Sequence, residues 1–305
     1  MTLLLMLKIA FHSAYNHPVP EGHRFPMLKY DLIAEQLVYE GTITESNLFT
    51  PSRILQTDLL RSHDAAYIHA LNTLSLSPSA IRKTGFALTD EFVTREEIIM
   101  QGTIDAAVCA VNNGIGMNIA GGTHHAYKEH GEGFCLYNDI ILAADYLLAH
   151  TLAKKVLVID LDVHQGNGTA KMAEGNAAIF TFSMHGATNY PAHKEQSDLD
   201  IALPEKTTDE VYLKMLKETL SRLIDEVQPD HIFFQSGVDV LATDKLGKLS
   251  LSREGCKERD RYVLNLCKQN KIPLTISLGG GYSESIIDIV EAHCNTFRLA
   301  QELYY

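Results

Sequence analysis

The sequence has no closely spaced pair of cysteines, no long apolar run and no excess of basic residues, and each absence excludes a class of protein. The cysteines are odd in number and scattered along the chain. They are Cys109, Cys135, Cys256, Cys267 and Cys294. This pattern is typical of reduced thiols and not of a disulfide framework, so we expect a cytoplasmic protein.

No apolar stretch among the 305 residues is long enough to span a bilayer, so we expect no membrane span. The apolar start from Leu3 to Leu7 is short and lacks both a preceding positive region and a small-residue cleavage site. It runs directly into Lys8 to Phe11, which can continue as a strand. We therefore predict a first strand here and not a signal peptide.

The charge balance is acidic, with a formal net charge of −12. Nucleic-acid binders carry a basic patch, so this balance argues against a nucleic-acid partner. It is compatible with a cationic substrate such as a lysine-bearing peptide or a polyamine. The chain has no internal repeat, low-complexity tract or linker, and α/β folds often use this length for one core, so we predict a single domain over residues 1–305.

Apolar spacing along the chain predicts helices that alternate with short apolar strands. Helices are expected at Met27 to Glu40, Ala65 to Leu74, Thr94 to Val111, Asn138 to His150, Thr169 to Ala173, Asp209 to Val227, Arg253 to Gln269 and Ser283 to Gln301. Strands after the first are expected at Ile115 to Ala120, Lys155 to Asp160, Ala178 to Ser183, His231 to Gln235 and Pro273 to Leu278. This alternation predicts an α/β fold whose central, mostly parallel sheet is flanked by helices on both faces.

Two segments give more specific predictions of local structure. The run Thr94-Arg95-Glu96-Glu97 matches a capping box and predicts that the long helix begins there. The stretch from His185 to Thr207 is too long for a plain connection, and we predict a functional loop.

The stretch from Val156 to Gly168 carries the strongest chemical signal. Its first four residues are branched and apolar, as in a strand buried on both faces. Side chains alternate along a strand, so Asp160, Asp162 and His164 point the same way and converge at its carboxyl end. Two carboxylates and an imidazole suit a divalent metal such as zinc, although two loop aspartates with a chance histidine remain the alternative.

Three further polar segments follow predicted strands. They are Gly121-Gly122-Thr123-His124-His125 with Gly131-Glu132-Gly133-Phe134-Cys135, then Ser236-Gly237-Val238-Asp239, and Gly279-Gly280-Gly281-Tyr282. Each alone could be an ordinary strand-to-helix turn. Together they predict one active site at the carboxyl ends of the strands.

This set of motifs resembles the zinc-dependent histone deacetylase family. Gln165 and Asn167 are similar to the class IV branch, and His23 to Met27 resembles bacterial members. The resemblance implies the arginase/deacetylase fold, one zinc ion per chain and hydrolysis of an N-acyl bond on lysine or a related amine. Iron in place of zinc stays open, and so does the oligomeric state.

The resemblance also implies roles for individual residues. Asp162, His164 and Asp239 would bind the zinc. His124 and His125 would handle protons, with Asp160 behind the first and Asn167 behind the second, and Tyr282 would donate to the substrate carbonyl. A K+ ion would lie near Asp160, Asp162, His164, Ser183 and Met184. The substrate channel would include Phe134, Gly133, Gly280 and Tyr190, with Arg24 in a deeper internal cavity. A core position for Phe134 and a surface position for Arg24 stay open as alternatives.

Asn167 departs from the carboxylate found at this position in other classes. A carboxylate behind a histidine raises the imidazole pKa, whereas an amide orients the ring without that charge. The hypothesis is that His125 stays neutral and acts as general base. Replacing Asn167 with Asp should then move the acidic limb of the pH-rate profile upward.

The motifs are also compatible with other functions. A ureohydrolase of the same fold would need more carboxylates, but Gly237 and Asn167 stand where its extra ligands would be. A catalytically inactive acyl-lysine binding module would keep the pocket without hydrolysis. Among substrates, the class IV resemblance suggests long fatty acyl groups on lysine, while bacterial relatives also include deacetylases of polyamines and other small amines.

Overall fold

The computed structural model describes residues 6–305, and its centre is one sheet of eight parallel strands. The strands are β1 (Ile9–Ala10), β2 (Leu48–Phe49), β3 (Ile115–Asn118), β4 (Val156–Asp160), β5 (Ile179–Gly186), β6 (Leu199–Leu203), β7 (His231–Ser236) and β8 (Leu274–Leu278). Their order across the sheet is β2-β1-β3-β8-β7-β4-β5-β6. The predicted parallel α/β architecture is confirmed.

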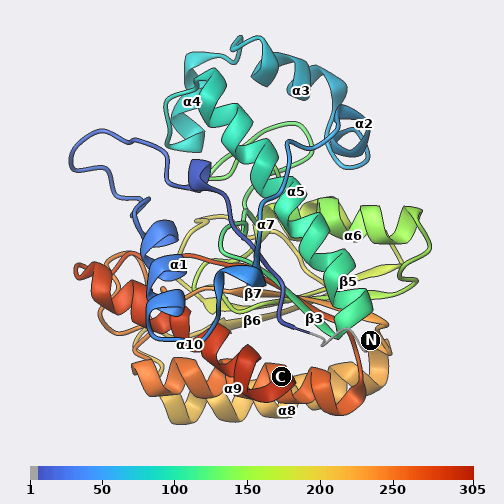
Figure 1. Cartoon of the computed structure of the whole chain (residues 1–305), viewed down its shortest axis with the longest axis vertical. Helices are drawn as coiled ribbons and strands as arrows, with labels where there is room; N and C mark the ends of the chain where they lie inside the picture. Colours follow the sequence, from blue (N-terminus) through green and yellow to red (C-terminus); the bar gives the residue numbers. More distant parts are fainter. Residues whose placement is uncertain (1–5) are drawn as a thin grey trace.

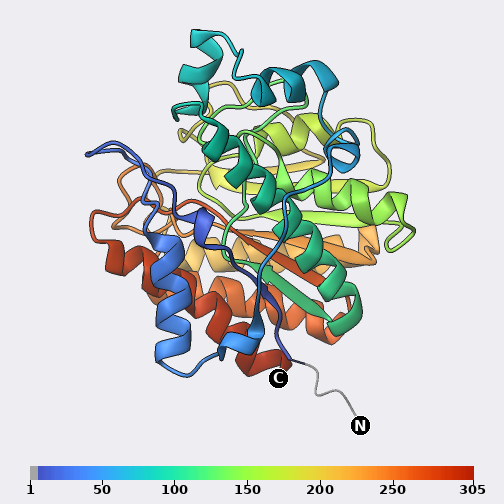
Figure 2. The same ribbon diagram turned by 45° about the horizontal axis from the view of Figure 1, so that its top comes forward.

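Helices cover both faces of the sheet (Figures 1 and 2). They are α1 (Lys29–Tyr39), α2 (Gln56–Leu59), α3 (Ala65–Asn72), α4 (Pro78–Thr84), α5 (Asp90–Asn113), α6 (Asp139–Ala149), α7 (Asn167–Ala173), α8 (Asp209–Val227), α9 (Arg253–Asn270) and α10 (Ile286–Tyr304). Helices α5 and α6 pack together on one face, while α1, α8, α9 and α10 line the other. The short helices α2 to α4 gather at the top of both views, beyond one end of α5.

The strand order explains why distant motifs meet. Strands β3, β8, β7 and β4 are neighbours in the sheet, and each is followed by one of the four polar segments. In register, Asp160 at the end of β4 lies opposite Gln235 of β7, which in turn pairs with Ser277 of β8. Because all these strands run the same way, their carboxyl ends form one continuous edge.

The long helix α5 begins earlier than the capping-box pattern predicted. Its N-cap is Thr89, whose side chain accepts a hydrogen bond from the backbone N–H of Phe92 at 3.1 Å. Thr94 therefore lies inside the helix, and Glu97 pairs with Arg53 instead of capping. The prediction of a helix start at Thr94 is wrong because an equally good Thr cap precedes it by five residues.

Two further boundaries differ from the sequence prediction. The stretch predicted as a loop from His185 holds strand β6, which adds a parallel edge strand beside β5. Residues 187–198 are the connecting loop that remains. The last helix begins at Ile286 and continues to Tyr304, past the predicted end at Gln301. The first predicted strand starts at Leu3, and its residues up to Leu5 lie outside the described part of the chain.

Candidate active site

Asp162, His164 and Asp239 form a buried cluster at the carboxyl edge of the sheet. One ligand atom from each lies within 4.8 Å of the others. His164 Nδ1 is 3.0 Å from Asp162 Oδ1 and 3.1 Å from Asp239 Oδ2. The other oxygen of each carboxylate accepts a backbone N–H, from Gly280 at 2.6 Å and from Val163 at 2.9 Å. One oxygen of each carboxylate is thus fixed by the backbone while the other faces the imidazole.

The electrostatics of this cluster fit a divalent cation. Burial and the neighbouring charge of Asp162 raise the pKa of Asp239 to about 7. Two buried carboxylates repel each other unless a positive charge compensates them. A metal ion bound by two oxygens and one imidazole nitrogen would supply that charge, so the residues present fit a mononuclear metal site.

The two histidines after β3 face each other beside this cluster. His124 Nε2 is 3.1 Å from His125 Nε2. Behind them, His124 Nδ1 contacts Asp160 Oδ2 at 2.7 Å, and His125 Nδ1 contacts Asn167 Oδ1 at 2.6 Å. The structure therefore brings together the two histidines and the residue that the resemblance placed behind each of them.

The two histidines have opposite pKa shifts. Burial lowers the pKa of His124, but the carboxylates of Asp160 and Asp162 outweigh it and raise the pKa to about 8. Burial, together with the positive charge of His124 and His164, lowers the pKa of His125 well below its ordinary value. At neutral pH the pair thus consists of one charged and one neutral imidazole.

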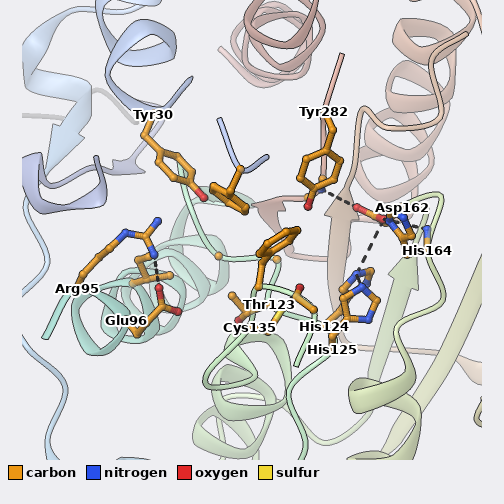
Figure 3. Close-up of a pocket in the computed structure, with 18 residues that line it drawn as sticks. Tyr30, Arg95, Glu96, Thr123, His124, His125, Cys135, Asp162, His164 and Tyr282 are labelled. Carbon is orange, nitrogen blue, oxygen red and sulfur yellow. Dashed lines mark hydrogen bonds and ion pairs between the residues drawn. The ribbon is translucent and has the colours of Figure 1, made fainter. Parts of the chain in front are cut away.

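Tyr282 and a group of aromatic rings enclose the pocket beside these residues. Figure 3 shows Tyr282 reaching into the pocket, with its hydroxyl toward the middle of the labelled side chains. Its ring lies 6.0 Å from that of Phe134 and 6.2 Å from that of Phe25, measured between centroids. Burial and the nearby carboxylates of Asp239 and Asp162 raise the pKa of Tyr282 well above its ordinary value, which keeps the hydroxyl protonated.

The predicted channel residues lie in two connected parts of this pocket. Gly133 and Phe134 line both the inner part, which reaches His124, and the outer part, which opens to the surface. Gly280 lines the inner part and Tyr190 the outer part, where its ring stands edge-on to His125 at 4.9 Å. The connecting loop from residue 187 to 198 thus contributes to the rim, as expected of a functional loop.

Arg24 does not occupy a deeper internal cavity, and that prediction is wrong. Its side chain is exposed and lines the outer pockets beside Phe134 and Tyr282. The inner pocket holds a different arginine, Arg95 of α5, next to Glu96. Figure 3 places this ion pair on the opposite side of the pocket from Asp162 and His164.

The sequence did not predict Arg95 and Glu96 as pocket residues, because the capping-box pattern placed them at the start of a helix. Both are buried inside α5, on a helix whose other buried side chains are largely apolar. Two adjacent charges inside an apolar helical stretch would have been the signal. Arg95 Nη2 and Glu96 Oε2 have no hydrogen-bond partner within residues 6–305.

Three of the residues implied for a monovalent cation lie where the end of β4 pairs with the middle of β5. Asp160 and Ser183 are register partners on these strands, and Met184 follows next on β5. All three are buried. These residues are therefore close enough to form a candidate site for a monovalent cation.

Comparison with known proteins identifies the family. The family described as "Histone deacetylase domain" matches residues 23–297. An uncharacterized protein of Picosynechococcus sp. is 38% identical over 97% of this chain and 99% of its own length. Histone deacetylase 2 of Arabidopsis thaliana is 28% identical over 94% of this chain and 77% of its own length. Histone deacetylase clr6 of Schizosaccharomyces pombe is 30% identical over 90% and 70%, respectively.

A solved structure supports the fold. The crystal structure of the HDA15 HD domain superposes with a TM-score of 0.78 at 21% identity, covering 95% of this chain and 89% of that chain. No helix in the described part of this chain is long and apolar enough to cross a membrane. The sheet, the site at its carboxyl edge and the matching domain lead to one conclusion: this chain is a hydrolase of the histone deacetylase family.

Proposed function

We propose that this chain is a zinc-dependent lysine deacylase that hydrolyses the amide of N-acyl-lysine. The observation that carries the proposal is the convergence of the Asp162, His164 and Asp239 cluster, the histidine pair and Tyr282 on one pocket. Three protein ligands leave a coordination position open, which is typical of catalytic zinc. When bound, zinc polarises the amide carbonyl and lowers the pKa of water.

The histidines supply the proton transfers in this proposal. The Nδ1–H of His125 donates to Asn167 Oδ1, so Nε2 carries the lone pair and is the nitrogen that can accept a proton from the attacking water. His124, charged beside Asp160, is the donor to the departing amine. The neutral amide of Asn167 behind His125 also supports a class IV type of site.

Tyr282 stabilises the oxygen that becomes negative when water adds to the amide carbon. Its raised pKa keeps it a hydrogen-bond donor at neutral pH. The packed rings of Phe25 and Phe134 hold the tyrosine ring while its hydroxyl faces the pocket. A donor that is already oriented needs no reorganisation during the reaction.

We further propose that the pocket prefers short acyl groups to long ones, because its inner part contains the Arg95–Glu96 ion pair. The unpartnered Arg95 Nη2 and Glu96 Oε2 need polar neighbours, which ordered water in the pocket can supply. A long apolar chain would displace that water and leave both atoms unsatisfied, at a cost of about 1–3 kcal/mol each. The ion pair in the inner pocket therefore argues against the long-chain preference that the class IV resemblance suggests.

A series of acyl-lysine peptides from acetyl to myristoyl tests both parts of the proposal. We expect kcat/KM of the zinc-loaded protein to be highest for acetyl and to fall by at least about tenfold at myristoyl, as two unsatisfied groups imply. Acetylated polyamines serve as the comparison substrates, and faster hydrolysis of these would favour a small-amine deacetylase. A rate that rises with chain length would contradict the role given to Arg95 and Glu96.

The acidic limb of the pH-rate profile tests the assignment of His125. A carboxylate at position 167 would stabilise the imidazolium and raise the pKa of His125, so the base becomes protonated at higher pH. Because Glu132 lies beside Asn167, the change is made as N167D together with E132Q, which avoids two adjacent carboxylates. We expect the acidic limb of kcat/KM to move upward by about one pH unit relative to E132Q alone. An unmoved limb would assign it to another group.

The residues where the end of β4 pairs with β5 support a proposed K+ site. Asp160, Ser183 and Met184 would contribute oxygens beside the zinc ligands Asp162 and His164. A cation there would help to neutralise the buried carboxylate of Asp160, whose other neighbour is His124.

A further inference from the structure

Asn167 lies between a histidine and a carboxylate, and its amide contacts both. Its Oδ1 is 2.6 Å from His125 Nδ1, and its Nδ2 donates to Glu132 Oε1 at 2.7 Å. The same Nδ2 donates to the Tyr127 hydroxyl at 3.0 Å, and that hydroxyl donates onward to Glu195 Oε1 at 3.2 Å. Both hydrogens of the Asn167 amide group therefore have an acceptor.

An amide is the side chain that satisfies both neighbours at once. A carboxylate at position 167 would accept from His125 but would face Glu132 as a second negative charge. Rotating the Asn167 amide by 180° would turn Oδ1 toward Glu132 and Nδ2 toward His125, with no donor between the two oxygens. Glu132 thus selects one of the two amide orientations.

The backbone holds Glu132 against this site. Gly133 has a φ of +56°, and a Cβ at this position would lie 2.7 Å from Cδ2 of His125. Only glycine allows the loop to approach the imidazole so closely, and this approach brings the preceding Glu132 side chain to Asn167. The Glu132 carboxylate also accepts from the Tyr190 hydroxyl at 2.7 Å, while His130 Nε2 lies 3.8 Å from its second oxygen.

Glu132 carries a negative charge at neutral pH. Partial burial opposes its ionisation, but the donors His130, Tyr190 and Asn167 outweigh burial and hold its pKa below the ordinary value. It is therefore a strong acceptor for the Asn167 amide, since hydrogen bonds to ionised groups are stronger than those between neutral groups.

We propose that Glu132 is a positioning residue for the hydrolysis, which orients the Asn167 amide and thereby fixes the proton of His125 on Nδ1. With that proton fixed, Nε2 faces the pocket as the acceptor. The inference rests on the proposed deacylase function, in which His125 Nε2 receives the proton of water. The negative charge of Glu132 thus acts on His125 through Asn167, and Glu132 itself does not contact the substrate.

Four variants separate orientation from a merely structural role. E132A removes the acceptor, and we expect kcat on acetyl-lysine peptide to fall by about 10- to 100-fold with little change in KM, as for other residues that orient a catalytic ligand. E132Q retains an oxygen that can accept from Asn167 and should lose less. N167D should lose activity because two carboxylates then face each other. At the pH optimum, kcat of N167D/E132Q should be about tenfold or more higher than kcat of N167D, because Gln can donate a hydrogen bond to Asp.

The matched control is E129A, which removes a carboxylate from the same loop. The Glu129 side chain is 61% exposed and lies 3.5 Å from His130, and none of its contacts reaches Asn167. We expect kcat within about twofold of wild type, as for surface changes. Thermal unfolding of all variants shows whether a loss of kcat follows a loss of folding instead.

A second measurement does not depend on activity. The 15N chemical shifts of the His125 imidazole in the zinc-loaded protein report which nitrogen carries the proton. We expect the Nδ1–H form in wild type and a mixture of the two tautomers in E132A. An unchanged tautomer in E132A, or N167D and N167D/E132Q with equal kcat, would overturn the role of Glu132. Absence of hydrolysis by wild type would instead overturn the deacylase function, while the tautomer could still be measured.

Discussion

Replacing Tyr282 with Phe should lower kcat on acetyl-lysine peptide by about 100-fold or more, because one preorganised donor to the developing oxyanion is lost. The substitution keeps the ring, whose centroid lies 6.0 Å from that of Phe134 and 6.3 Å from that of His164. Packing around the pocket should therefore survive, and peptide binding should change little. Steady-state kinetics and peptide titration measure the two effects separately.

The matched control is Tyr39→Phe, since the Tyr39 side chain is 90% exposed at the end of α1 and does not line the pocket. This pair of variants also separates an enzyme from an acyl-lysine binding module. Intact binding with lost hydrolysis in Y282F fits the enzyme. Hydrolysis that Y282F leaves undiminished would remove the hydroxyl from the mechanism, and binding without any hydrolysis by zinc-loaded wild type would favour the binding module.

The sequence was informative where a single strand and its following loop carry the chemistry. Val156 to Ile159 are branched, apolar and buried, so β4 and the polar segment that follows it could be assigned from the sequence pattern alone. The parallel arrangement then required Asp239, which follows β7, to lie at the same edge as Asp162, which follows β4. The physical constraints that made this part predictable are local: strand alternation and the common direction of neighbouring strands.

The sequence was less informative where a contact depends on which of two local signals prevails. Thr89 and Thr94 are both acceptable N-caps, and only packing of the added turn around Phe92 decides between them. Because α5 begins at the earlier threonine, Arg95 and Glu96 lie inside the helix and line the inner pocket, where we propose that they limit the length of the acyl group. Likewise, the sequence indicated that a neutral amide, Asn167, lies behind His125. The spacing of residues could not predict that a loop places the carboxylate of Glu132 behind Asn167.

Arg24 shows the same limit for a residue taken from family resemblance. The resemblance fixes its place in the sequence, but its side chain is exposed, and Phe25, Tyr30 and Arg95 line the inner pocket instead. Tyr30 and Arg95 lie in contact, with the guanidinium carbon 5.4 Å from the ring centroid. A second guanidinium beside them would add like charge in a buried space.

Replacing Asp239 with Asn should remove zinc and, with it, hydrolysis. Loss of a direct ligand should weaken zinc binding by more than the roughly 10- to 100-fold typical of residues behind a ligand. Elemental analysis after dialysis against limiting zinc should give far less than one zinc per chain, and the rate should fall to background. The control is D225N, which alters an exposed carboxylate on α8. A D239N protein that retains zinc and activity would contradict the assignment of this ligand.

The same substitution should have the opposite effect on the stability of the metal-free protein. The pKa of Asp239 is raised to about 7, first by burial and then by Asp162. An acid with a raised pKa in the folded state binds more protons when folded, so metal-free wild type should lose stability as pH rises from about 4 to 7. D239N lacks this titration and should unfold at a higher temperature than wild type at pH 8 without zinc. With zinc present the order should reverse, because only wild type gains the free energy of metal binding. Such a reversal would show that the Asp239 carboxylate destabilises the metal-free fold and stabilises the metal-bound one.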